Sequence, residues 1–172
     1  MKLSKKICSA IVGAAAVGFG GYGLNAMAAT ENAATATVDI VGSIGISQTT
    51  GMSFGDIATT GAGTVILDTA NGVSGGGNNI PAGGTVTSAV FAITGDDVGY
   101  VVTMPASITL TGPGNDMTID TFTYLAEDAA TDGTGTISGG NGTMTVGGTL
   151  NVGSPQTAGT YSATYSVTAL YE

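Results

Sequence analysis

Apolar and polar residues alternate along most of the chain from Thr35 onward, and this period of two limits the possible folds more than any other feature. Successive side chains of a β-strand point to opposite faces, so the alternation predicts strands with one buried face. A helical period of three to four residues is not sustained anywhere after residue 28. The sequence therefore predicts an all-β fold.

The first alternating stretch, residues 35–47 (TATVDIVGSIGIS), is long for a strand. Its apolar positions are Ala36, Val38, Ile40, Ile44 and Ile46, with Gly42 in the same phase. At about 3.4 Å per residue these thirteen residues would span roughly 44 Å, more than twice the usual strand length. The pattern predicts a strand over the whole stretch and leaves open which surface buries its apolar face.

The first 28 residues have the features of a secretory signal peptide. Three lysines near the start precede a glycine-rich apolar run, which ends in small residues two apart, Ala26 and Ala28. This run is shorter than the roughly 20 apolar residues that a membrane-spanning helix needs. We therefore predict that residues 1–28 are a cleaved signal peptide, that the mature chain begins at Ala29, and that it is not inserted in a membrane.

Cleavage would leave a chain of 144 residues (172 minus 28) without Lys, Arg, His or Cys. All twelve acidic residues lie in this part, so its side-chain charge is −12. Nucleic acids and anionic lipids are bound by cationic side chains, and the composition therefore argues against both as partners. Without salt bridges or disulfides, stability has to come from apolar burial and backbone hydrogen bonds.

The missing side chains also argue against an enzyme. General acid–base catalysis near neutral pH most often uses His, and phosphate chemistry uses Lys or Arg. Carboxylate pairs remain, but the acidic residues are adjacent in a turn-like sequence or scattered over segments rich in Gly and Thr: Asp96, Asp97, Asp116, Asp120, Glu127, Asp128 and Asp132. Turns and solvent-exposed faces account for all of them. The sequence predicts no catalytic residues and no cofactor.

One acidic loop, residues 126–135 (AEDAATDGTG), is a candidate metal site. Its weak calcium candidates are Glu127, Asp128 and Asp132, because secreted acidic proteins bind calcium through loop carboxylates. The loop lacks the Asp spacing of an EF-hand and the glycine-aspartate pattern of nonapeptide calcium repeats. The favoured interpretation is an exposed acidic loop.

Short strands joined by glycine-rich turns are predicted along the rest of the chain. These predicted strands cover residues 63–68, 85–95, 100–114, 116–125, 142–152 and 159–172. Residues 72–84 (GVSGGGNNIPAGG) are predicted to be a loop. Pro105 lacks a donor for the strand ladder, so the chain must bend or change sheet there. A change of phase between Ile119 and Phe122 predicts a bulge or a corner.

The phases of these strands also select a core. We expect these residues to be buried: Phe91, Ile93, Tyr100, Val102, Leu110, Phe122, Met144, Val146, Leu150, Tyr165 and Val167. About eight short strands with such turns predict a single β-sandwich related to the immunoglobulin fold over residues 42–172. A closed barrel is the alternative.

Four stretches resemble the bacterial domain of unknown function 4402 family (DUF4402). They are residues 38–58 with a Phe-Gly-x-Ile element at Phe54 to Ile57, residues 91–112, and the closing stretches 144–152 and 159–171. The resemblance implies a secreted bacterial β-sandwich, similar to pilin-like spore coat U domains and to subunits of chaperone–usher fimbriae. Such a protein would pass through the periplasm to the surface of a Gram-negative bacterium. The mature chain lacks the cysteine pair of many fimbrial subunits.

The resemblance suggests a partner for the long first stretch. In chaperone–usher fimbriae an extended N-terminal segment of one subunit completes the sandwich of the next by β-strand addition. By this reading, residues 29–41 are an N-terminal extension that donates a strand, and the assembly residues are Ala36, Val38, Ile40, Ile44 and Ile46. The alternative is one intramolecular strand that bends at Gly42 and crosses between sheets.

Two functions follow from these alternatives. The first is a non-enzymatic structural or adhesive subunit of a surface fibre, whose partners are further copies, other fibre subunits or a periplasmic chaperone. The second is a monomeric surface or matrix protein that binds carbohydrate or calcium as an adhesin.

Overall fold

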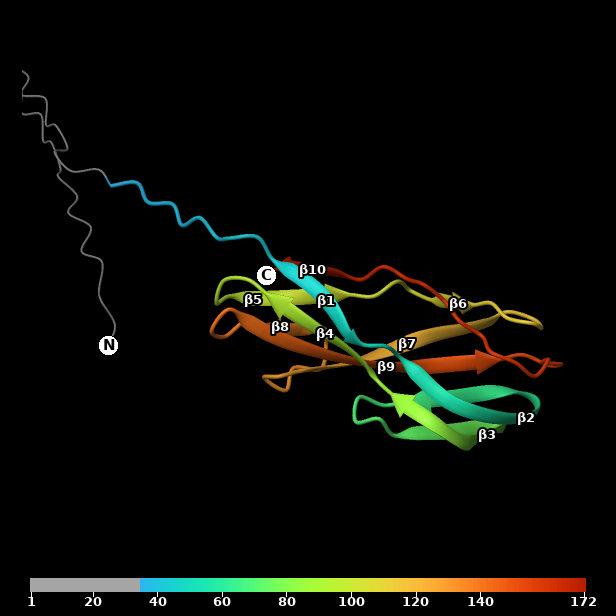
Figure 1. Ribbon diagram of the computed structural model, residues 1–172. Coiled ribbons are helices and arrows are strands. Elements are labelled where there is room, and N and C mark those ends of the chain that lie inside the picture. The colour runs from blue at the N-terminus through green and yellow to red at the C-terminus, as the bar shows by residue number, and fades with distance from the viewer. Residues whose placement is uncertain (1–34) are drawn as a thin grey trace, which may run out of the picture. The chain divides into compact units, whose positions relative to one another are not determined.

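This computed structural model describes residues 35–172 of the chain. Within them the strands form two antiparallel sheets (Figure 1). The strands are β1 (Gly45–Thr50), β2 (Ser53–Leu67), β3 (Val73–Thr87), β4 (Ala89–Thr94), β5 (Gly99–Thr103), β6 (Ile108–Leu110), β7 (Met117–Ala126), β8 (Thr134–Thr136), β9 (Asn141–Val152) and β10 (Thr168–Tyr171). Within these residues the chain has no helix, and so none that is long and apolar enough to cross a bilayer. The predicted signal peptide and its cleavage point at Ala29 lie outside the described residues.

The larger sheet has the strand order β1-β4-β9-β2-β3, and the smaller sheet has the order β10-β5-β8. Strand β9 organises the larger sheet, because it pairs with β4 and β2 along one edge and with β7 along the other. Strand β6 extends this sheet beyond β7. The all-β prediction is confirmed, and two antiparallel sheets are consistent with a β-sandwich.

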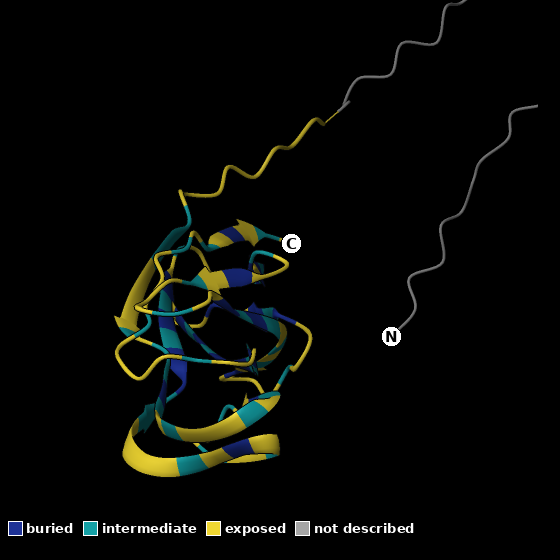
Figure 2. Ribbon diagram, turned by 90° about the vertical axis from the view of Figure 1, so that its right-hand side faces the viewer, coloured by how far each residue is buried: buried dark blue, intermediate teal, exposed yellow. Residues whose placement is uncertain are grey.

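The core contains most of the residues selected by the alternation phases (Figure 2). The predicted residues that are buried are Phe91, Ile93, Tyr100, Val102, Met144, Val146 and Leu150. Four others, Leu110, Phe122, Tyr165 and Val167, are only partly buried and pack against this core. Val65, Leu67 and Ile137, which are fully buried, also belong to this core. Burial of a large aliphatic or aromatic side chain stabilises the fold by roughly 1.5–3 kcal/mol.

Both local irregularities predicted from the sequence are present. Strand β5 belongs to the smaller sheet and β6 to the larger one, so the chain changes sheet across Pro105. In β7 the register with β9 shifts between Asp120 and Thr123, and Thr121 between them has a φ of 48°. A side chain at positive φ is rare in a strand, and here it marks the bulge.

The prediction of a loop at residues 72–84 is wrong, because β3 pairs with β2 along most of this stretch. Backbone pairing does not need large side chains, and the glycines let the two strands approach closely. A Cβ on Gly63 would collide with the carbonyl oxygen of Gly76 across the pair. Much of this hairpin is exposed to solvent (Figure 2).

The turn between β2 and β3 folds back onto Ser88, at the junction of β3 and β4. The buried Ser88 hydroxyl donates to the Asp68 carbonyl at 2.6 Å and accepts from the Asn71 amide at 3.3 Å. The Ser88 amide donates to Asn71 Oδ1 at 2.7 Å. These bonds hold the end of β2 where residues Gly63–Leu67 can pair with β9.

Two predicted strands are shorter than expected. The first begins only at Gly45, so the prediction is wrong for residues 35–44, which have no regular secondary structure. The last is limited to β10, so the prediction is wrong for most of residues 159–167, where a single bridge joins Ser162 to Thr111. In both stretches the alternation is present, but the described chain provides no continuous strand for it to pair with.

Candidate functional site

The N-terminal extension keeps its apolar side chains in solvent. In the structure Val38 is 81% exposed, Ile40 is 89% exposed and Val41 is 48% exposed, and Ala36 is exposed too. An alternating apolar face is normally buried against a sheet, whereas Val38 and Ile40 bury little of their surface. The other two predicted assembly residues, Ile44 and Ile46, are partly buried against the core. We call residues 35–41 the extension.

Asp96 fixes the first residues of the domain. Its carboxylate accepts a hydrogen bond from the Gly42 amide, while its own amide donates to the Tyr171 hydroxyl at 2.9 Å. The neighbouring Asp97 accepts from the Gly140 amide at 2.8 Å. The adjacent carboxylates therefore bind backbone amides from different parts of the chain and act as turn and anchor residues.

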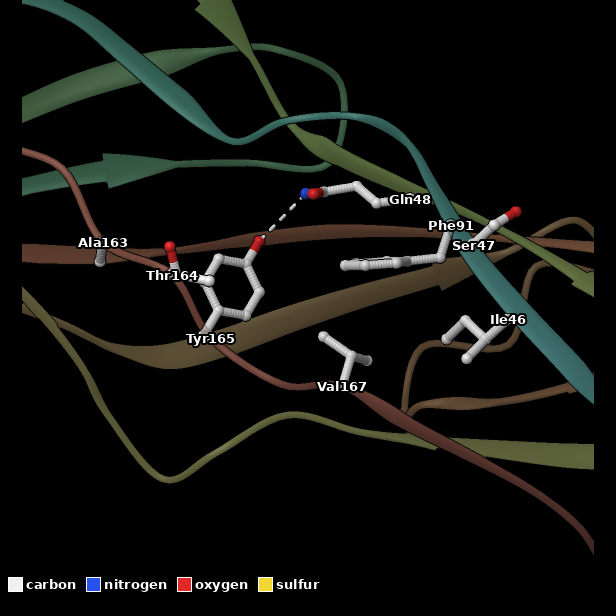
Figure 3. A pocket seen from close by; sticks show the side chains of 8 residues that line it. All are labelled: Ile46, Ser47, Gln48, Phe91, Ala163, Thr164, Tyr165 and Val167. Atoms are coloured by element: carbon white, nitrogen blue, oxygen red, sulfur yellow. Dashed lines mark hydrogen bonds between the residues drawn. The ribbon is translucent and has the colours of Figure 1, made fainter.

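An open groove lies between the start of the domain and its C-terminal segment. Its first half is a hollow of about 340 Å³ between β1 and residues 163–167, with Phe91 of β4 in its lining (Figure 3). Its second half is a hollow of about 570 Å³ between residues 52–59 and residues 156–161. Core side chains such as Ile119 and Leu150 line this second half. The two hollows are bordered by successive parts of residues 46–59 and of residues 156–167, and we call the two hollows together the groove.

Backbone without a ladder partner borders the first half of the groove on both sides. Strand β1 pairs with β4 on one side, and its other edge has no ladder in the described residues. Residues 163–167, on the opposite border, are not part of a ladder either. A strand with a ladder partner on just one side exposes a row of unpaired N–H and C=O groups along its other edge. The groove therefore has free backbone donors and acceptors along its borders.

A side-chain hydrogen bond crosses the groove at its first half. Gln48 Nε2 donates to the Tyr165 hydroxyl at 3.3 Å, above the ring of Phe91 (Figure 3). Burial raises the pKa of Tyr165, and the hydrogen bond from Gln48 offsets part of this rise. A side-chain hydrogen bond thus links β1 to residues 163–167, whereas adjacent strands of a sheet are linked by backbone hydrogen bonds.

The predicted calcium candidates do not form a metal site. Among residues 35–172 there is no group of three His, Cys, Asp or Glu side chains that could hold a metal ion. Asp128 accepts from the Ala130 amide at 3.2 Å, and Asp132 accepts from both the hydroxyl and the amide of Thr134. These bonds from Thr134 lower the pKa of Asp132. Glu127 is exposed beside them, so all three residues belong to an acidic turn.

The domain with this groove corresponds to a known family. Residues 44–171 match the model of the DUF4402 family, a domain of unknown function. The chain belongs to the DUF4402 family. The DUF4402 match spans all ten strands and both borders of the groove, and the extension precedes it. The chain matches none of the curated proteins and none of the solved structures with which it was compared.

Proposed function

We propose that this DUF4402 protein is a secreted, non-enzymatic structural subunit of a bacterial surface fibre, and that copies assemble by β-strand addition. The observation that carries the proposal is the exposed alternating face of the extension, with Val38 and Ile40 in solvent. Burying each of these side chains in a partner would contribute roughly 1.5–3 kcal/mol. Backbone hydrogen bonds to a free strand edge would add to this.

The geometry favours a fibre over a closed dimer. A strand donor and a strand acceptor are different surfaces of one subunit, so contact between them is head-to-tail. Such contacts continue indefinitely unless the rotation between subunits closes a ring. Each added copy would again present one free extension and one free edge.

Several finer assignments belong to the same proposal. The sandwich is of the immunoglobulin-like, pilin-like type, and residues 1–28 direct export through the periplasm to the surface of a Gram-negative cell. A periplasmic chaperone is a suitable partner before assembly, because a free strand edge exposed in solution promotes aggregation.

Gel analysis of the exported protein, with and without heating, tests this function. We expect a ladder of oligomers in unheated samples that collapses to one band on heating. Deletion of residues 29–41 should abolish the ladder while the subunit still melts cooperatively. A protein that stays monomeric at high concentration would contradict the proposal and would favour a monomeric adhesin.

A further inference from the structure

The described domain offers more than one free strand edge, and two of them belong to β1 and β3, the first and last strands in the order β1-β4-β9-β2-β3. One is the edge of β1 inside the groove, and the other is the outer edge of β3. The proposed function requires one edge that accepts the donated strand, and either of these two edges could be that acceptor. Their regularity and their side chains distinguish them.

The edge of β3 is poorly suited to a donated strand. Its pairing with β2 is interrupted by three register shifts, and Pro81 in it has no N–H to donate. Gly77, Gly83 and Gly84 all have positive φ, so the backbone departs from an extended strand. Ile80 is the one large apolar side chain exposed on β3. Proline, bulges and an uneven backbone are the devices by which edge strands avoid pairing.

The groove has the properties that β3 lacks. Strand β1 is a regular ladder partner of β4 over Gly45–Gln48, so its free edge is extended there. Phe91, only 3% exposed, lies between this edge and Tyr165, and Ile46 and Val167 flank it (Figure 3). A strand laid along β1 would direct every second side chain toward Phe91 and the others toward solvent.

The extension fits this groove in length and in pattern. Residues 36–40 place three apolar side chains on one face over about 14 Å, at 3.4 Å per residue. Residues 163–167, which border the first half of the groove, are a stretch of the same length. Ala36, Val38 and Ile40 are small to medium in size.

We infer that the groove between β1 and residues 163–167 is the acceptor, and that the extension of a second copy of this chain occupies it. This inference rests on the proposed function and specifies its acceptor. Val38 is the centre of the apolar face, so it lies at Gln48 and Tyr165 whichever way the donated strand runs. The hydrogen bond between Gln48 and Tyr165 has to open when the donor enters.

Cysteine cross-linking between two copies tests the assignment, because Cys8 is the only cysteine of the chain. In a Cys8→Ser background, one protein carries Val38→Cys and the other carries Gln48→Cys. Both positions are exposed in the single subunit, so neither substitution disturbs the core. The two proteins are mixed while reduced, allowed to assemble and then oxidised, and disulfide-linked pairs are identified by mass.

Two matched controls use the same procedure. Thr37→Cys replaces Val38→Cys to place the thiol on the opposite face of the donor, and Asn78→Cys replaces Gln48→Cys to place it on exposed β3. We expect the pair of positions 38 and 48 to cross-link between copies at least about tenfold more than either control pair. This selectivity follows from the short Cβ separation that a disulfide requires.

The outcomes separate this inference from the proposed function. Oligomer ladders with cross-links to Asn78→Cys, or with none to Gln48→Cys, would show that strands are exchanged at another edge and would overturn the groove assignment. A protein carrying both Val38→Cys and Gln48→Cys that links only within one chain would also overturn it, because the extension would then fill its own groove. Absence of any oligomer would refute the proposed function itself.

Discussion

Replacing Ile40 by Asp tests whether the apolar face of the extension is buried in a partner. Ile40 is 89% exposed in the single chain, so the substitution removes little burial from the subunit itself. Substitutions at such surface positions usually change the free energy of unfolding by no more than about 0.5 kcal/mol. The melting temperature of the isolated subunit should therefore stay close to that of the wild type.

The effect on assembly should be much larger. Burial of the Ile40 side chain in a partner contributes roughly 1.5–3 kcal/mol, all of which the variant loses. An unpaired carboxylate in an apolar groove adds a desolvation cost of at least about 1–3 kcal/mol. The sum is at least about 2.5 kcal/mol, and since 1.4 kcal/mol corresponds to a tenfold change, association should weaken by at least about 60-fold.

Circular dichroism of the dilute subunit measures the first effect, and sedimentation across a concentration series measures the second. Thr37→Asp is the matched control, because it adds the same charge on the opposite face of the extension. The control should assemble within a few-fold of the wild type. A fall of many degrees in the melting temperature of the dilute Ile40→Asp subunit would indicate an intramolecular strand. Normal melting together with normal assembly would remove Ile40 from every buried surface.

Three further predictions concern the domain itself. Ser88→Ala should lower the free energy of unfolding in urea by about 1–3 kcal/mol, because the carbonyl of Asp68 loses its buried donor; an unchanged midpoint would contradict the role of this contact. Phe91→Ala and Leu150→Ala should each cost about 2–5 kcal/mol, and wild-type melting would refute the core assignment. Burial raises the pKa of Tyr100 and Tyr165, so the folded state retains their protons longer than the unfolded state does. Their contribution to stability is full below about pH 10 and is lost as the pH rises above it. Absorbance at alkaline pH should show Tyr100 and Tyr165 ionising above the usual range near pH 10, and ionisation within or below that range would contradict this.

Local sequence signals predicted the parts of the fold that depend on local chemistry. Pro105 marks a change of sheet because the missing N–H affects its own ladder position, whatever lies elsewhere in the chain. The bulge in β7 follows from a change of phase that is visible within four residues, Ile119 to Phe122. The phases of β4, β5 and β9 likewise selected residues that are buried in the core, since each strand is amphipathic along its own length.

Pairing between distant segments could not be predicted in this way. The glycine-rich stretch 72–84 has few side chains to show a pattern, and its strand is held by the backbone of β2. The groove depends on the lack of pairing between segments that are far apart in sequence, as Gln48 and Tyr165 are, at 117 residues. Alternation in residues 161–167 shows that they are able to form a strand, but it does not show whether a partner is present. The alternation of apolar residues in the extension is visible in the sequence. Only the structure shows that these side chains are exposed.

The composition of the chain restricts how copies can recognise each other in the proposed fibre. After residue 28 there are twelve acidic side chains and no basic ones, so no salt bridge between copies is available and their charges repel. Attraction must come from backbone hydrogen bonds and apolar burial, and the hydrogen bonds alone do not distinguish one register from the next. Asp39 adds to the distinction made by the apolar face, because it lies between Val38 and Ile40. A slip of one residue turns every side chain of the donated strand to the other face, which would bring the Asp39 carboxylate against Phe91 and move both apolar residues into solvent. The cost of burying that unpaired charge adds to the lost apolar burial, and a single acidic residue in the extension thus helps to exclude a slip of one residue in a contact that has no ion pairs.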